Sequence, residues 1–267
     1  MNWLCICLIS AGIAFVPSAS ARADVTVLVR GEQAPFASQD WPGQGLAVQL
    51  LHAALEAGPL PVKASLTWEN DGDKFLSRAE AGEADLALLV PGVDCASPKP
   101  STACTQFHYS DPLLHVVTLL FVPTEMQFDY SAPADLSGKS LCRTVGDGPP
   151  PLDALAKSGK VLVVEHAQVA GCFDMLEAGK VDVVAVDEFT GVASLFAQAL
   201  TESVTPLSQP LATVSLHAIA SKTHWRATAH IYRVNAGLAE LHQSGAYAEL
   251  LNQHLSVYWA ELRARLR

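Results

Sequence analysis

The sequence lacks the motifs by which many hydrolases and nucleotide-binding proteins are recognised. It contains no G-x-S-x-G nucleophile elbow, no G-x-x-x-x-G-K-[ST] phosphate loop and no G-x-G-x-x-G turn. Its short glycine turns, around Gly43 and Gly146, carry little information alone. No motif therefore predicts catalysis.

Basic side chains are scarce, and long apolar runs are confined to one end of the chain. There are 17 Lys and Arg against 27 Asp and Glu, a formal net charge of −10. Nucleic acids and anionic lipids are bound by clustered Lys and Arg, so we expect neither partner. Beyond residue 16, no stretch approaches the ~18 apolar residues that a membrane-spanning helix requires. We therefore do not expect the protein to be embedded in a membrane.

The apolar run at residues 3–16 predicts a secretory signal peptide at residues 1–23. Small residues and the sequence Ala21-Arg22-Ala23 follow it, as at a cleavage site. We expect cleavage after Ala23, a mature chain beginning at Asp24, and a location in the periplasm. Removing residues 1–23 takes away Arg22 and no acidic residue, which leaves 16 basic and 27 acidic side chains.

Four cysteines remain in the expected mature chain. An even number of thiols in an oxidising compartment favours disulfide bonds. We expect the pairs Cys95–Cys104 and Cys142–Cys172, with buried free thiols as the alternative. Neither pair has the C-x-x-C spacing of a redox site or a zinc knuckle.

The histidines are scattered along the sequence and predict no metal site. His224 and His230 fall in a predicted helical region six residues apart, a spacing that should keep them from sharing one metal ion. His52, His115 and His254 stand in apolar contexts that favour structural roles. We therefore expect neither a metal nor another cofactor.

The hydrophobic pattern alternates between short β-branched runs and longer amphipathic stretches, which is typical of an α/β fold with a mostly parallel sheet. Strands are predicted over 25–29, 62–68, 84–90, 115–122, 139–144, 161–164, 181–186 and 212–220. Helices are predicted over 46–56, 74–81, 152–158, 169–178, 191–200, 227–242 and 246–255. Two successive strand–helix series indicate two α/β units.

Several short sequences recur in the order and spacing of one protein family. They include Tyr109-Ser110-Asp111-Pro112-Leu113, Asp135-Leu136-Ser137-Gly138-Lys139 and Glu177-Ala178-Gly179-Lys180-Val181-Asp182. In these the chain resembles the extracytoplasmic solute-binding proteins that supply polar amino acids to ABC importers. The resemblance implies a type II periplasmic binding fold, with lobe 1 at 24–122 and 214–267 and lobe 2 at 123–213. It also implies hinge crossings near 122–126 and 210–214. We expect a monomer, with an ABC permease or another periplasmic protein as partner.

The resemblance also implies a ligand site between the lobes. In the family an Arg of lobe 1 binds the ligand carboxylate and an Asp of lobe 2 pairs with its ammonium group. Asp187 falls at the position of that Asp, and a helix cap is the alternative role. Gln33 and Phe36 lie on the first binding loop, where Phe36 could instead belong to the core. Gly92 follows the third long strand, and we include it in the expected site.

The expected site departs from the family pattern at two places. The lobe 1 Arg is missing: Ser97 falls near its position, and Lys99 offers only a point charge without the planar fork of an Arg. Asp147 stands where family members offer a Thr, although Arg143 could offset its charge or reach the cleft itself. Because burying like charges is costly, we expect the cleft to favour a cationic or neutral polar solute over an α-amino acid.

Two other functions remain open. The chain could be an accessory or sensor protein that has kept the fold of a solute-binding protein in a periplasmic system but lost the transport ligand. It could also be an enzyme similar to the cyclohexadienyl dehydratases. That enzyme also requires a cation for its substrate carboxylates, so the missing Arg disfavours it.

Overall fold

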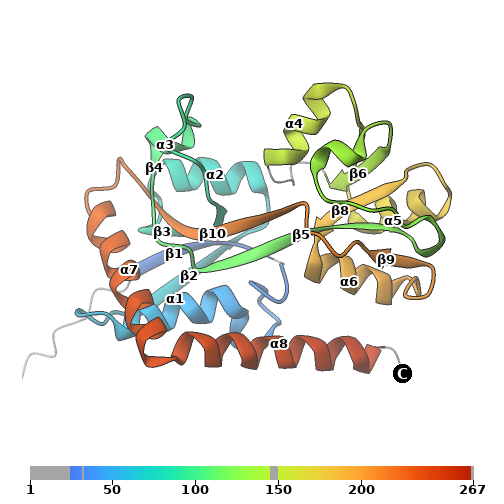
Figure 1. Cartoon of the computed structure of the whole chain (residues 1–267). Helices are drawn as coiled ribbons and strands as arrows, with labels where there is room; N and C mark the ends of the chain where they lie inside the picture. The colour runs from blue at the N-terminus through green and yellow to red at the C-terminus, as the bar shows by residue number, and fades with distance from the viewer. Residues whose placement is uncertain (1–24, 32, 145–149, 266–267) are drawn as a thin grey trace, which may run out of the picture.

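The structure is a computed structural model that describes residues 25–31, 33–144 and 150–265. The expected signal peptide at residues 1–23 and the expected site residue Asp147 lie outside the described residues. Within the described residues, strands and helices alternate as the hydrophobic pattern predicts (Figure 1). None of the described helices is both long enough and apolar enough to cross a membrane.

One sheet runs through both halves of the molecule. Its strands are β1 (Val25–Arg30), β2 (Ala64–Glu69), β3 (Leu86–Pro91), β4 (Phe107–Tyr109), β5 (Leu114–Pro123), β6 (Ser140–Thr144), β7 (Leu162–His166), β8 (Val183–Asp187), β9 (Val204–Pro206) and β10 (Ala212–Ser221). The main order is β2-β1-β3-β10-β5-β8-β6-β7, with β4 on β10 and β9 on β5. The three strands at each end are parallel, and β5 and β10 run antiparallel to their neighbours.

Helices cover both faces of the sheet in each half (Figure 1). They are α1 (Leu46–Ala57), α2 (Gly72–Glu80), α3 (Ala103–Gln106), α4 (Pro150–Ser158), α5 (Val169–Glu177), α6 (Glu188–Ala197), α7 (Ala227–Ser244) and α8 (Ala246–Arg265), with short 3-10 turns at Pro42–Gln44, Thr124–Met126 and Pro133–Leu136. In β8, Val183 and Ala185 join one apolar core, and Val184 and Val186 join another. Because successive side chains of a strand point to opposite faces, a strand covered on both sides is apolar throughout.

An equivalent pair of hydrogen bonds from one residue to an Asp carboxylate, called the clamp below, lies at the start of the sheet in each half. In the first half, Asp85 Oδ2 accepts hydrogen bonds from the backbone N–H and the hydroxyl of Thr26, at 2.8 and 2.9 Å. In the second half, Asp182 Oδ2 accepts the equivalent two bonds from Ser140, both at 2.7 Å. Each Asp precedes a central strand and ties it to its neighbour. The family sequence ending in Val181-Asp182 is thus explained by strand alignment.

Strands β5 and β10 connect the two halves. They pair with each other from Leu114↔Leu216 to Thr118↔Ala212. From Thr118 onward, β5 pairs with β8 of the second half. The lobe boundaries expected at residues 122 and 214 remain a proposal, and this pairing favours placing the first of them at Thr118.

Both expected disulfide bonds are present. Cys95 and Cys104 close a short loop after β3, with their Cα atoms 5.6 Å apart. Cys142 of β6 is bonded to Cys172 of α5, with a Cα–Cα distance of 5.5 Å. The second bond lies in the apolar core and joins the sheet to a covering helix.

Candidate functional site

Gly92, at the carboxyl end of β3, lies against the crossing strand β10. Its N–H donates to the carbonyl of Ser215 at 2.8 Å. A Cβ at this position would lie 2.6 Å from His217 Nε2 and would also collide with the hydroxyl of Ser215. Only glycine therefore fits here without a movement of the Ser215 and His217 side chains. In open α/β sheets, ligands bind outside the carboxyl ends of the strands, so this contact lies at the expected edge of the cleft.

His217 is the centre of a polar network that sequence reasoning missed. Its Nδ1 lies 2.7 Å from the carbonyl oxygen of Ser110, and its Nε2 lies 2.8 Å from the Ser215 hydroxyl. Tyr109 packs edge-on against the imidazole, with ring centroids 5.8 Å apart. Burial lowers the pKa of His217, more than the bond to Ser110 raises it, which keeps the ring neutral. The Tyr109-Ser110 segment thus supports β10 at the crossing.

The first binding loop is folded back on itself. Gln33 donates its N–H to Ala37 and accepts hydrogen bonds from the N–H groups of Phe36 and Ala37. Phe36 is buried and belongs to the core around α1. In this structure Phe36 is thus a core residue, the alternative role that the sequence left open.

An aromatic cluster joins the two halves beside this loop. Phe36 meets Phe189 of α6 edge-to-face, with centroids 5.2 Å apart. Tyr258 of α8 packs on Phe189 at the same distance and donates its hydroxyl to the Phe189 carbonyl at 2.5 Å. Figure 1 shows α8 running from beneath α1 towards α6. The last helix therefore holds α6 of the second half against the core of the first.

Asp187 ends β8 and caps α6. Its Oδ1 accepts from the N–H groups of Phe189 and Thr190, at 3.1 and 3.0 Å, as an N-cap residue does. The next residue, Glu188, is partly buried, and burial followed by repulsion from Asp187 raises its pKa. Two neighbouring carboxyl groups thus mark the carboxyl end of β8, a setting that suits a cation.

Arg143 pairs with Glu165 on the adjacent strand β7. The shortest distance, from Arg143 Nη2 to Glu165 Oε1, is 2.8 Å, and Nε donates to the same oxygen at 3.1 Å. The two residues are directly paired in the ladder, so the contact is a cross-strand ion pair. The position expected for the family Arg falls in the loop closed by Cys95 and Cys104, where Lys99 is exposed.

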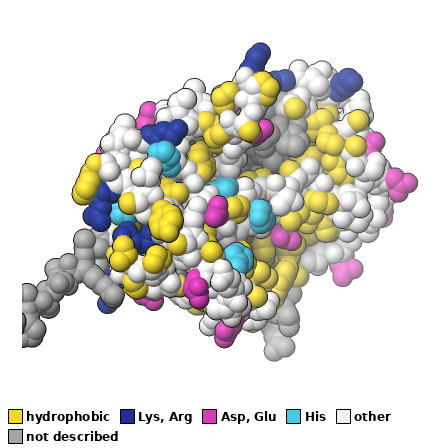
Figure 2. Space-filling model, turned by 60° about the vertical axis from the view of Figure 1, so that its left-hand side comes forward, with side chains coloured by type: hydrophobic (Ala, Val, Ile, Leu, Met, Phe, Trp, Pro, Cys, Tyr) yellow, Lys and Arg dark blue, Asp and Glu magenta, His cyan; other side chains and the backbone are white. Residues whose placement is uncertain are grey.

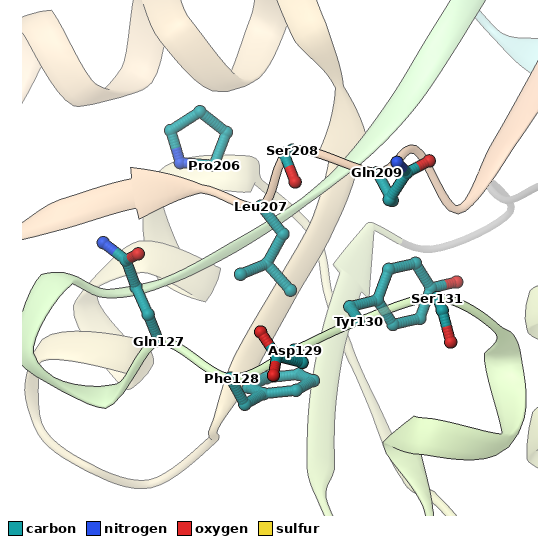
Figure 3. Close-up of a pocket in the computed structure, with 9 residues that line it drawn as sticks. All are labelled: Gln127, Phe128, Asp129, Tyr130, Ser131, Pro206, Leu207, Ser208 and Gln209. Atoms are coloured by element: carbon teal, nitrogen blue, oxygen red, sulfur yellow. The ribbon is translucent and has the colours of Figure 1, made fainter.

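The structure also shows a surface groove away from the expected site residues. It has a volume of about 910 Å³ and is formed by residues 127–131, which follow β5, and 206–209, which precede β10 (Figure 3). Its apolar part is formed by Phe128, Tyr130, Pro206 and Leu207, and Asp129, Ser131 and Gln209 are among the residues that supply polar groups. The groove lies on the second half, and it contains none of Gln33, Phe36, Gly92, Arg143 or Asp187.

The expectation that His224 and His230 lie too far apart to share an ion is wrong. Helix α7 begins at Ala227, so His224 belongs to the preceding turn and the six-residue spacing is not helical. Both imidazole Nε2 atoms approach the carboxylate of Asp85. The turn lets the two rings converge on one point.

No family model matches the sequence, and no curated protein does. Solved structures do match, at probability 1.00. The GluR0 ligand-binding core in complex with L-glutamate has a TM-score of 0.67 and 14% identity, over 88% of this chain and 99% of that chain. An amino acid ABC transporter substrate-binding protein from Streptococcus pneumoniae, bound to L-arginine, has a TM-score of 0.64 and 18% identity, over 91% and 96%.

A third similar structure is a histidine kinase sensor domain described as similar to periplasmic binding proteins. It has a TM-score of 0.66 and 19% identity, over 88% of this chain and 96% of that chain. At these identities the likeness concerns the fold. The chain therefore has the two-lobe α/β fold of the periplasmic binding proteins.

Proposed function

We propose that the protein is an extracytoplasmic solute-binding protein that captures a small polar solute between its two lobes. The observation that carries this proposal is the arrangement of the sheet. The carboxyl ends of β3 and β8 lie on either side of the crossing strands, and they present Gly92 from one half and Asp187 from the other. Two-lobe proteins of this kind close on ligands by hinge motion.

The charge of the described cleft residues supports a cationic or neutral polar ligand. Asp187 and Glu188 bring two carboxyl groups to one edge of the sheet. The similar solved structures include a protein bound to L-arginine, a cationic amino acid. We infer that a small cationic amine is bound by Asp187, and that Gln33 and Phe36 approach the ligand only when the lobes reorganise. Transport through an ABC permease and a periplasmic location belong to this proposal.

A sensor or accessory role is the second candidate, and a specific contact favours it. The Phe36–Phe189–Tyr258 cluster holds the two halves together through apolar packing. A protein that must open for each ligand loses those contacts each time, which is costly. One of the similar structures is a sensor domain. No described feature favours the dehydratase alternative, and we propose no catalytic activity.

A ligand panel tests the proposal. Thermal shifts with amino acids, polyamines, quaternary amines and sugars should show stabilisation by a cationic member of the panel, since a ligand bound to the folded state raises its stability. Small-angle scattering should then show a smaller radius of gyration on binding. An unchanged scattering profile at saturation contradicts hinge closure and favours the sensor or accessory role.

Substitutions at Asp187 separate its two roles. Asp187→Ser keeps a capping oxygen for α6 but removes the charge, whereas Asp187→Ala removes both. If Asp187 binds the ligand cation, both variants should lose about 2–5 kcal/mol of binding free energy. Only the Ala variant should also lose about 0.5–2 kcal/mol of stability through the cap. Unchanged ligand affinity in Asp187→Ser contradicts the ligand role.

A further inference from the structure

Three side chains with metal-binding atoms converge on the first half, away from the cleft. They are Asp85, which precedes β3, His224 in the turn after β10, and His230 in the first turns of α7. Figure 2 shows several His side chains on the surface that this view brings forward, whereas the side chains of this cluster are only 15% (His224), 17% (Asp85) and 2% (His230) exposed. Asp85 lies at the amino end of β3, whereas Gly92 and the expected ligand site lie at its carboxyl end.

The distances among the three ligand atoms fit one small cation. Asp85 Oδ1 lies 3.0 Å from His230 Nε2 and 3.4 Å from His224 Nε2. All three ligand atoms lie within 4.8 Å of one another. Zinc bonds of about 2.0–2.1 Å at tetrahedral angles place neighbouring ligand atoms about 3.3 Å apart. The observed distances bracket that value for both pairs that include the carboxylate.

His230 provides an independent observation. The residue is 1% exposed. Its Nε2 is a buried polar atom with no hydrogen-bond partner of acceptable geometry among the described residues, although Asp85 Oδ1 lies at 3.0 Å. Two metal ligands that point at the same ion lie close to each other without forming a hydrogen bond, as His230 Nε2 and Asp85 Oδ1 do here. Buried polar atoms rarely lack a hydrogen-bond partner, so the Nε2 atom of His230 is a candidate for binding a ligand.

The Asp182 clamp in the second half shows that the histidines are not required to align the strands. Asp182 makes the same two bonds to Ser140 that Asp85 makes to Thr26. No described histidine faces Asp182 in a cluster of this kind. In Asp85 the hydrogen bonds from Thr26 go to Oδ2, and the other carboxylate oxygen, Oδ1, faces the rings of His224 and His230. The hydrogen bonds to Thr26 therefore act as outer partners that orient a metal-binding carboxylate.

We propose that Asp85, His224 and His230 form a binding site for a divalent transition-metal ion, with Zn²⁺ the best match. Two imidazoles and one carboxylate are ligands that Zn²⁺ accepts, and a fourth position would be completed by water. His224 and Asp85 are partly exposed, so the ion can enter from solvent. The ion would join α7 to the start of the sheet and would stabilise the first half independently of solute binding.

Arg233 lies beside one of the proposed ligands and provides a second test of the site. Arg233 Nη1 lies 3.4 Å from His230 Nδ1. When Nε2 binds a metal, Nδ1 must carry a proton, and that proton would face the guanidinium. Arg233→Gln replaces the opposing donor with an amide whose oxygen can accept a hydrogen bond from the Nδ1–H, so it should tighten binding by about 10–100-fold, the usual size of an outer-partner effect.

Titration of untagged, chelator-treated protein with Zn²⁺ tests the site. Calorimetry should give one ion per chain, and Co²⁺ in its place should give the visible absorption of tetrahedral coordination. His224→Ala should weaken Zn²⁺ binding by at least about 100-fold, beyond what loss of an outer partner costs. Since His224 is partly exposed, this variant should stay folded, as circular dichroism can verify.

Controls decide between this site and a structural cluster. His242→Ala removes an exposed histidine that stacks on Tyr247 elsewhere, and it should leave Zn²⁺ affinity unchanged. Asp182→Asn weakens the clamp of the second half and should lower stability without changing affinity. The proposal is overturned if wild-type protein binds no Zn²⁺, if His224→Ala binds it equally well, or if Arg233→Gln weakens binding. Because Arg233→Gln keeps all three ligands, it remains informative even where His230 variants do not fold.

Discussion

Phe189 should hold the two halves together, and truncating it should loosen them. Its side chain is 8% exposed and packs edge-to-face against Phe36 and Tyr258, with both centroid distances at 5.2 Å. Phe189→Ala should lower the free energy of unfolding by about 3–5 kcal/mol, the usual cost of removing a buried aromatic ring. Phe189→Leu keeps most of the apolar volume but loses two aromatic pairs at about 0.5–1.5 kcal/mol each, so it should cost about 1–3 kcal/mol.

Phe173 offers a matched control for this prediction. It is fully buried and packs edge-to-face on Phe121 at 5.6 Å, but both residues belong to the core of the second half. Phe173→Leu should lower stability without changing the relation of the lobes. Denaturant unfolding measures the first effect, and small-angle scattering without ligand measures the second. If Phe189→Leu leaves the radius of gyration unchanged, or if Phe173→Leu enlarges it equally, the aromatic cluster does not restrain opening.

Three further predictions concern other parts of the fold. Gly92→Ala should cost about 1–3 kcal/mol of stability through the collision of its Cβ with β10, and a change below 0.5 kcal/mol, roughly the surface norm, would contradict the close packing. Burial lowers the pKa of His217 and His254 below the usual 6.5, so the unfolded state binds more protons than the folded state at acidic pH. The free energy of unfolding should therefore fall as the pH drops below about 6.5. A series of melting temperatures measured at different pH values checks this, and a stability that rises on acidification would refute it. Replacing both Cys142 and Cys172 with Ala should cost about 2–4 kcal/mol in denaturant unfolding, and no loss would show that the bond is dispensable.

Most of the fold could be predicted from the sequence because its strands and helices carry strong local signals. The run at 181–186 is buried on both faces apart from Asp182, and in the run at 139–144 Leu141 and Cys142 are buried on opposite faces; both runs predict strands without any knowledge of their neighbours. The ends of the helices were predicted less accurately than their existence, because a helix end depends on capping and chain-breaking residues and not on hydrophobic periodicity. The helix expected from residue 191 begins at Glu188, because Asp187 caps it, and α8 extends to Arg265, because no Gly or Pro follows residue 255.

The candidate site was less accessible to sequence reasoning because it depends on contacts between distant segments. Nothing near His217 indicates that its ring would lie between Ser110 and Ser215, since His217 and Ser110 are 107 positions apart in the sequence and only the folded chain brings them together. The convergence of His224 and His230 on Asp85 has the same origin. A helical reading of their spacing failed because a turn separates them. The disulfide bonds could be predicted more easily, because an even number of cysteines in an oxidising compartment favours pairing and no knowledge of the fold is needed.

The paired crossing strands determine which relative movements of the two halves the backbone permits. Strands β5 and β10 are in register over residues 114–118 and 212–216, and a shift by one residue would turn every side chain of this ribbon to the opposite face. The two halves therefore cannot slide along the strands. They can change their relative twist, since a two-stranded ribbon twists readily while its hydrogen bonds persist. Amide hydrogens in this ribbon should stay protected from exchange whether the halves are apart or together, so the axis of motion is itself among the most persistent parts of the backbone.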